Sequence, residues 1–104
     1  MEENKVENVI NIIKDMNIKD KLRLGICLTT SDWANILYNK VEMYEKFDTM
    51  LKEVDEEYRT TLINFAKYKL VMFTMAKIME MTKEEQNQVA LYLFNNINKQ
   101  SMTH

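Results

Sequence analysis

The side chains best placed to do chemistry in this 104-residue sequence are three carboxylates, Glu42, Glu45 and Asp48. Their spacing of three residues puts them on one face of a helix, as in enzymes that hydrolyse nucleotides with magnesium held between acidic pairs on facing helices. Such a site needs a second acidic pair. The best remaining one, Glu84 and Glu85, is better explained by the capping of a helix. The carboxylates therefore do not predict a metal site.

Nucleophilic and general-base catalysis usually recruit a histidine or an activated cysteine. The one histidine, His104, is the last residue, and a fraying terminus does not hold catalytic geometry. The one cysteine, Cys27, lies between Ile26 and Leu28, a setting typical of a small buried hydrophobe. The sequence also lacks a glycine-rich phosphate loop and a Cys/His cluster with zinc spacing. We therefore expect a protein that is not an enzyme and that uses no cofactor and no metal.

The composition favours one helical interaction domain spanning residues 1–104. Hydrophobic residues make up 46% and charged residues 29%, which excludes a disordered chain, and with no proline and one glycine the sequence lacks the turns of a β fold. A net charge of −2 argues against broad affinity for nucleic acid or anionic membranes. The first residues, MEENKVENV, are acidic where a secretion signal would be basic, so we expect a cytoplasmic protein.

Two short helices are expected in the first third of the chain. Apolar residues at helical spacing predict a helix over residues 3–16 and a second one after Asn17, whose side chain can cap it. Gly25 marks either a close crossing of two helices or an early end of the second helix. The polar run TTSD at 29–32 is the clearest break in the sequence, because such side chains satisfy the amides at a helix start.

Two long helices are expected next, because no glycine or proline occurs between Trp33 and Thr82. A break near Asp55, followed by a helix over 56–81, gives an antiparallel hairpin on which the short helices pack. Thr82 and Glu85 form a capping box that starts a last helix at Lys83. The class is thus all-α, a small helical bundle built on a long antiparallel hairpin with short flanking helices. The inward-facing residues are expected to be Trp33, Leu37, Val41, Tyr44, Phe47, Leu51, Val54 and Tyr58, then Leu62, Phe65, Ala66, Phe73 and Ala76.

Two surface features indicate contact with another protein. Residues 42–57 carry seven acids and two lysines, a local charge of −5 that suits a basic partner, although a solvated hairpin tip is the commoner explanation of such a run. Residues 70–81, LVMFTMAKIMEM, are apolar on nearly every side of a helix. Their methionines are expected to fill either the core or a groove in a partner. The partner would be another protein or a second copy of the chain. The candidate contact residues are Tyr38, Glu42, Glu45, Asp48, Met72, Met75 and Met79.

A helix-turn-helix DNA-binding regulator is the alternative function. Residues 18–39 have the required order of helix, polar turn and helix. The face that would read the bases is not basic, and Lys19, Lys21 and Arg23 are offset by neighbouring acids. We therefore expect no nucleic-acid partner, and no membrane partner either.

Over its whole length, through stretches such as SDWANILYNKVEMYEKF and FAKYKLVMFTMAKIMEM, the chain resembles the staphylococcal phage inhibitor of the bacterial replicative helicase loader. The resemblance implies a phage-encoded inhibitor in the host bacterial cytoplasm. It would bind the AAA+ ATPase domain of the loader and block its assembly and the initiation of DNA replication. A phage inhibitor directed against a host defence system is a second hypothesis that fits the same overall features of the sequence. The resemblance carries over no binding residue.

Overall fold

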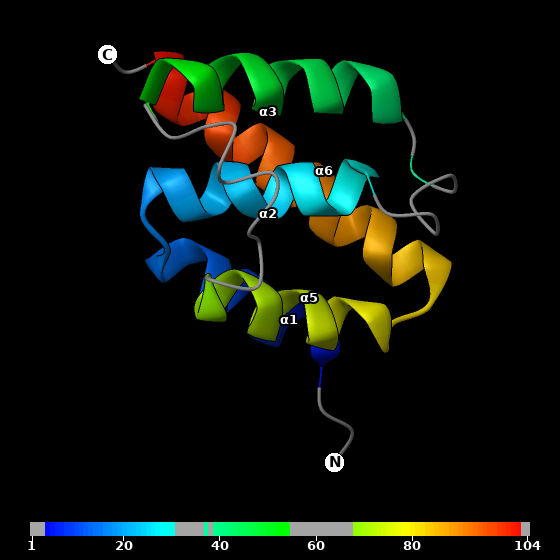
Figure 1. Cartoon of the computed structure of the whole chain (residues 1–104). Coiled ribbons are helices and arrows are strands. Elements are labelled where there is room, and N and C mark those ends of the chain that lie inside the picture. Colours follow the sequence, from blue (N-terminus) through cyan, green and yellow to red (C-terminus); the bar gives the residue numbers. More distant parts are fainter. Residues whose placement is uncertain (1–3, 31–36, 38, 55–67, 103–104) are drawn as a thin grey trace.

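The computed structural model describes residues 4–30, 37, 39–54 and 68–102, with side chains up to Asn98. All regular structure in this part of the chain is helical (Figure 1), which confirms the all-α class and the small bundle. The helices are α1 (Lys5–Asp15), α2 (Ile18–Thr30), α3 (Lys40–Val54), α5 (Lys69–Met79) and α6 (Lys83–Met102). None of them, within the described ranges, is long and apolar enough to cross a membrane.

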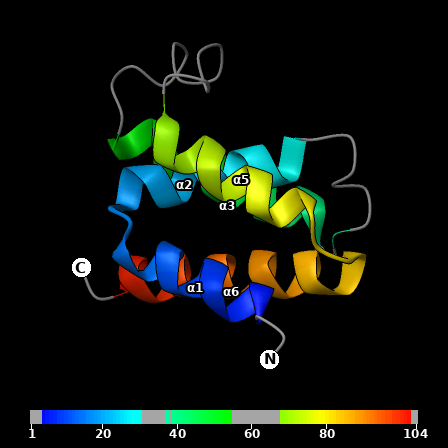
Figure 2. The ribbon, with the colours of Figure 1, turned by 90° about the horizontal axis from the view of Figure 1, so that it is seen from below.

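The bundle is organised around α2. It packs against α3, α5 and α6, and α1 fills the remaining space against α5 and α6. Figure 1 shows α3 on one side of α2 and α5 on the other, and Figure 2 shows α1 and α6 side by side across the molecule from these three helices. The apolar stripes of all these helices meet in one core. It contains Val9, Ile13, Leu22, Leu24, Ile26, Leu28, Met43, Phe47, Leu51, Val71, Ile78, Val89, Leu93 and Ile97.

Three helix starts follow the capping chemistry of their sequences. The amide of Glu7 donates to Asn4 Oδ1 at 3.0 Å, and the amide of Asp20 donates to Asn17 Oδ1 at 2.8 Å, which confirms the cap expected at Asn17. The capping box is also confirmed. The amide of Thr82 donates to Glu85 Oε1 at 3.0 Å and the amide of Glu85 to Thr82 Oγ1 at 3.2 Å. These hydrogen bonds with Thr82 lower the pKa of the Glu85 carboxyl.

The two helices expected to form a hairpin are shorter than expected, and α2 lies between them. α3 begins at Lys40, after Asn39 in the left-handed region with φ 54°, a conformation that asparagine tolerates better than most residues. α5 begins at Lys69, because Tyr68 has the non-helical angles φ −98° and ψ 85°. Both boundaries lack glycine and proline, so the sequence carried no strong signal for either. The break at Asp55 and the inward positions Trp33, Tyr58, Leu62, Phe65 and Ala66 lie outside the described residues.

Gly25 marks a close crossing of helices, and α2 continues through it to Thr30. A Cβ added at Gly25 would lie 2.6 Å from Cγ and Cδ2 of Phe47 on α3. The Phe47 ring is fully buried and meets Phe94 of α6 edge to face, with ring centroids 5.9 Å apart. The missing side chain at Gly25 therefore makes the space in which α2, α3 and α6 join.

The face that α3 buries agrees in part with the one expected. Met43, Phe47 and Leu51, each four residues apart, are buried. Val41 and Val54, which we expected inside, are exposed, Val41 at 69%. The expected stripe was extended from a helix start at Trp33, whereas α3 runs from Lys40 to Val54, so both valines lie at the ends of the helix.

The thiol of Cys27 is expected to be inert in the folded protein. It is buried in α2, and desolvation by burial raises its pKa from 9.0 to about 12. At pH values well below 9 this lowers the thiolate fraction roughly 1,000-fold, and the thiolate is the species that reacts. Alkylation by iodoacetamide, followed by mass spectrometry, should therefore be slow in native buffer and fast in guanidinium. Rapid modification of the native protein would contradict this placement of Cys27.

Candidate interaction surfaces

The outer face of α3 presents the first group of candidate contact residues. Glu42 and Glu45 are exposed there, next to the exposed side chain of Val41. We call these three residues, together with Thr49, the α3 face. Among the described residues, the ion pairs do not involve Glu42 or Glu45, so an apolar side chain lies beside negative charge on an open surface. Such a combination suits a partner that offers an apolar group bordered by cations.

Two open grooves run along either side of the α3 face. One, of about 360 Å³, is lined by Thr29, Thr30, Lys40, Val41, Tyr44 and Glu45, and its walls are mostly apolar. The other, of about 480 Å³, is lined by Glu42, Glu45, Lys46, Thr49, Phe94 and Asn98. Glu45 lines both grooves and is therefore the central charge of the α3 face.

Asp48 does not belong to this face. Its side chain is mostly buried, and its Oδ2 forms an ion pair with Lys52 Nζ at a distance of 3.0 Å. Its other oxygen, Oδ1, is buried without a hydrogen bond among the described residues. We expected Asp48 on the water-facing side with Glu42 and Glu45. The Asp48 side chain instead lies close to the protein, paired with Lys52 on the next turn of α3.

Tyr38, the expected aromatic anchor of the acidic patch, lies outside the described residues. The exposed aliphatic group that the structure does place beside the carboxylates is Val41. Sequence reasoning missed Val41 as a surface residue because its spacing of four residues from Leu37 and three from Tyr44 fits an inner stripe. The sequence carries no strong signal for this exposure, because α3 begins after Asn39, whose left-handed conformation only the structure shows.

The structure separates the three candidate methionines of α5. Met75 is 6% exposed and belongs to the core, whereas Met72 and Met79 (60%) lie on the surface. Phe73 and Ala76, which we expected inside, are exposed as well, Phe73 at 54%. The face of α5 that packs inward consists of Val71, Thr74, Met75 and Ile78. α5 therefore covers the core with one side and leaves an apolar side in solvent.

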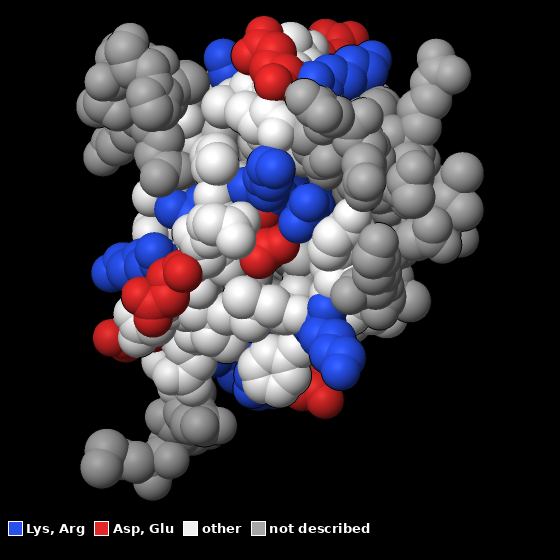
Figure 3. All heavy atoms as spheres, turned by 60° about the vertical axis from the view of Figure 1, so that its left-hand side comes forward, with Lys and Arg blue, Asp and Glu red and all other residues white. Residues whose placement is uncertain are grey.

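The two groups of candidate residues do not form one surface. The α3 face and the exposed side of α5 lie on helices on opposite sides of α2 (Figures 1 and 2). Figure 3, turned by 60° from Figure 1, shows uncharged atoms gathered in the lower part of the molecule, at the level of α1 and α5. A partner bound to α3 would therefore leave α5 uncovered, so the two surfaces must be considered separately.

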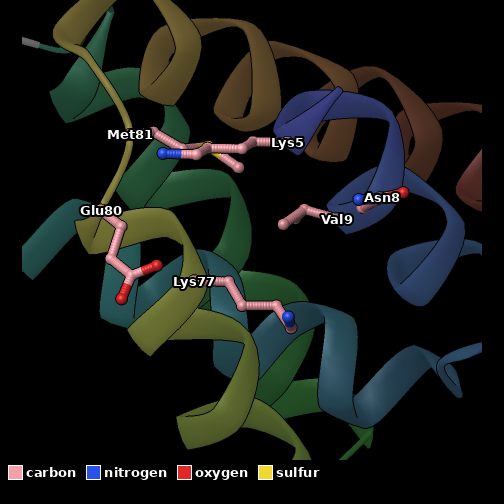
Figure 4. A pocket seen from close by; sticks show the side chains of 6 residues that line it. All are labelled: Lys5, Asn8, Val9, Lys77, Glu80 and Met81. Carbon is pink, nitrogen blue, oxygen red and sulfur yellow. The ribbon is translucent and has the colours of Figure 1, made fainter. Parts of the chain in front are cut away.

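A small hollow of about 80 Å³ lies where the end of α5 meets α1. Figure 4 shows its lining, with Lys5, Asn8 and Val9 from α1 and Lys77, Glu80 and Met81 from the end of α5. Glu80 provides the one carboxylate among these lining residues. No group of three or more His, Cys, Asp or Glu side chains with the geometry to bind a metal occurs in the described ranges.

Two of the three cations on which a DNA-binding role would depend are engaged within the bundle. Lys21 is 4% exposed and donates from Nζ to Asn96 Oδ1 of α6 at 2.8 Å, and burial lowers its pKa. Arg23 pairs with Asp20 at 2.9 Å and stacks its guanidinium 3.9 Å from the ring centroid of Tyr68. Of the three, Lys19 is exposed. Lys21 and Arg23 are thus engaged in contacts of the bundle, so the three cations do not form a basic surface.

Comparison with known proteins identifies no relative: no family model, curated protein or solved structure matches the chain. The function must therefore be inferred from these surfaces.

Proposed function

We propose that this protein is a non-catalytic inhibitor that binds a host protein through the α3 face and acts by covering the surface it binds. The α3 face itself carries this proposal. Glu42 and Glu45 are exposed beside Val41, which is 69% exposed, and a groove lies on each side of Glu45. A mostly exposed valine beside open carboxylates adds little to the core of the bundle, whereas it provides an apolar contact next to charged groups.

The AAA+ ATPase domain of the bacterial replicative helicase loader is the partner to which the resemblance of the sequence points. Its chemistry fits, because ATPases of this kind hold phosphates with lysine and arginine side chains, so the surfaces around their nucleotide sites are basic. A negatively charged helix face is attracted to such a surface and, once bound, prevents the next ATPase subunit from using it. Inhibition would then be stoichiometric, would involve no turnover, and would stop assembly of the loader and the initiation of DNA replication. The contact would bury on the order of 1,200–2,000 Å² in total.

The DNA-binding alternative has little support, because two of its three cations are held within the bundle and pair with α6, with Asp20 and with Tyr68. An inhibitor of a host defence protein is compatible with the same α3 face, since that reading changes the partner and not the contact surface.

Reversing one charge of the α3 face is expected to weaken binding to the purified ATPase domain. Glu45→Lys places a cation at the junction of both grooves, and we expect the Kd to rise about tenfold or more, mainly through slower association at low salt. Surface plasmon resonance over a range of salt concentrations measures both rates. The matched control is Asp15→Lys, the same charge change at an exposed position on α1, for which we expect less than about a threefold effect.

The binding of these two variants distinguishes between the candidate partners. Equal weakening by Glu45→Lys and Asp15→Lys would contradict a specific role for the α3 face. If the wild-type protein does not bind the ATPase domain at all, the loader is not the partner. Host lysate passed over wild-type and Glu45→Lys protein in parallel would then show which protein depends on the α3 face, and a defence protein would support the second inhibitor hypothesis.

A further inference from the structure

The exposed side of α5 carries four residues in line along the helix: Lys69, Phe73, Ala76 and Glu80. Their spacing of four, three and four residues is the spacing of a helix seam that packs against a second helix. All four are exposed, and we call them the α5 seam. A cation stands at one end, an anion at the other, and a large and a small apolar residue between them.

Apolar side chains border the α5 seam on both flanks. Met72 and Met79 line one flank, and Leu70 and Lys77 the other, with Lys77 Nζ 4.9 Å from the ring centroid of Phe73. Leu70 and Met72 are exposed to the same extent, 42% each. Residues from Leu70 to Met79 therefore present a strip of apolar surface about three turns long, which is more than scattered surface hydrophobes would give.

The two end charges lie at the wrong ends of their own helix. Lys69 is the first residue of α5, where the helix dipole favours anions, and Glu80 is its C-cap, where the dipole favours cations. Next to an antiparallel copy of α5, each charge would lie beside the opposite end of the neighbouring helix. Both charges would then have a favourable dipole and an oppositely charged side chain close by.

We propose that the α5 seam is a homodimer interface in which two copies of α5 pack antiparallel about a two-fold axis. The register follows from the positions of the seam residues. Lys69 of each copy lies beside Glu80 of the other, and each Phe73 packs against the other Ala76, a large residue against a small one. On one flank Met72 then meets Met79, and on the other Leu70 lies along the aliphatic stem of Lys77. α3 lies on the far side of α2, so the dimer leaves the α3 face open. Dimerisation is therefore separate from the proposed inhibitor function.

The interface is small, so the dimer is expected to be reversible. α5 has 11 residues and is therefore about 16 Å long, which places the contact at the lower end of specific interfaces. Sedimentation velocity from low micromolar to near-millimolar concentration should show a monomer that converts to a dimer. Higher salt should weaken the dimer without abolishing it, since salt screens the end charges and not the apolar middle.

Charge reversal at the two ends of the α5 seam tests both the interface and its antiparallel register. Lys69→Glu or Glu80→Lys alone places like charges opposite each other at both ends of the dimer, so each should raise the dimer Kd by about tenfold or more. An equimolar mixture of the two variants should associate as tightly as the wild type, because Glu at 69 then faces Lys at 80 and Lys at 69 faces Glu at 80. Both changes place charge in agreement with the dipole of α5, so thermal melts should show monomers at least as stable as the wild type.

Each outcome of the charge-reversal experiment either supports or contradicts the antiparallel α5 dimer. Weakening by either variant, together with recovery in the mixture, supports the antiparallel α5 dimer. A wild-type protein that stays monomeric at all concentrations overturns it and leaves the α5 strip to a different protein. A dimer that both variants leave unchanged forms elsewhere, and loss without recovery in the mixture rules out the register. Glu45→Lys serves as the charge-reversal control, since it lies on α3 and should not change the dimer; failure of the inhibitor proposal would leave this experiment unaffected.

Discussion

Gly25→Ala is expected to destabilise the protein by about 2 kcal/mol, although alanine is the better helix former. The added methyl would lie 2.6 Å from the Phe47 ring, which is fully buried against Phe94 and has little room to move. Overpacking of this kind costs about 1–3 kcal/mol, and the three ring atoms within 2.7 Å place it at the upper end. The helix-forming gain of about 1 kcal/mol offsets part of that cost.

Urea denaturation of the purified protein measures the change in the free energy of unfolding, and the melting temperature should fall by roughly 10 °C. The double variant Gly25→Ala with Phe47→Leu is the control. A smaller side chain at 47 makes room for the methyl, so the double variant should be less destabilised than the sum of the two single changes, by about 1 kcal/mol. Wild-type stability or better in Gly25→Ala would contradict the close crossing of α2 and α3.

Gln86→Glu is expected to destabilise the protein by about 3 kcal/mol near neutral pH. Gln86 is buried, and its Nε2 donates to two backbone carbonyls, those of Ile78 and Met81, each at 3.2 Å. These hydrogen bonds close the corner between α5 and α6. A carboxylate at this position donates nothing and faces both carbonyl oxygens from a buried site, so the change loses two hydrogen bonds and buries a repelled charge.

The loss of stability caused by Gln86→Glu should diminish as the pH falls. The unfolded chain ionises the introduced carboxyl with an ordinary pKa of about 4.3, whereas burial and the two carbonyl oxygens raise its pKa in the folded protein. The folded state then binds the proton more tightly, so stability relative to the wild type is recovered as the pH falls through the raised pKa and toward the unfolded one. A protonated carboxyl also restores one donor.

Urea denaturation of Gln86→Glu and of the wild type at several pH values gives the difference in their free energies of unfolding. Taking the difference cancels the titration of the carboxyl groups that both proteins share. Gln88→Glu, the same change at an exposed position of α6, is the matched control and should alter stability little at any pH. A Gln86→Glu protein as stable as the wild type near neutral pH would show that the two hydrogen bonds do not hold the α5–α6 corner.

The amino-acid sequence by itself was sufficient for the class of fold and for local helix chemistry. The caps at Asn17 and at Thr82 with Glu85 form as expected, because a side chain satisfying an amide three residues away depends only on neighbours in the chain. The burial of Cys27 follows equally from the apolar residues around it. Gly25 could be recognised as a special position, although the choice between a crossing and a helix end required the position of Phe47.

Only the tertiary structure decided which side of each long helix faces outward. Residues 40–54 and 69–79 are rich in apolar side chains on several sides, so helical spacing alone allows more than one buried stripe. Packing against α2 chose the stripe that contains Phe47 on α3 and the one that contains Val71 and Ile78 on α5, and this exposed Val41 and Phe73. It also placed the acidic and the methionine-bearing surfaces on opposite sides of α2. The physical reason is that capping is a local interaction, whereas the rotation of a helix about its own axis is set by contacts with residues distant in the chain.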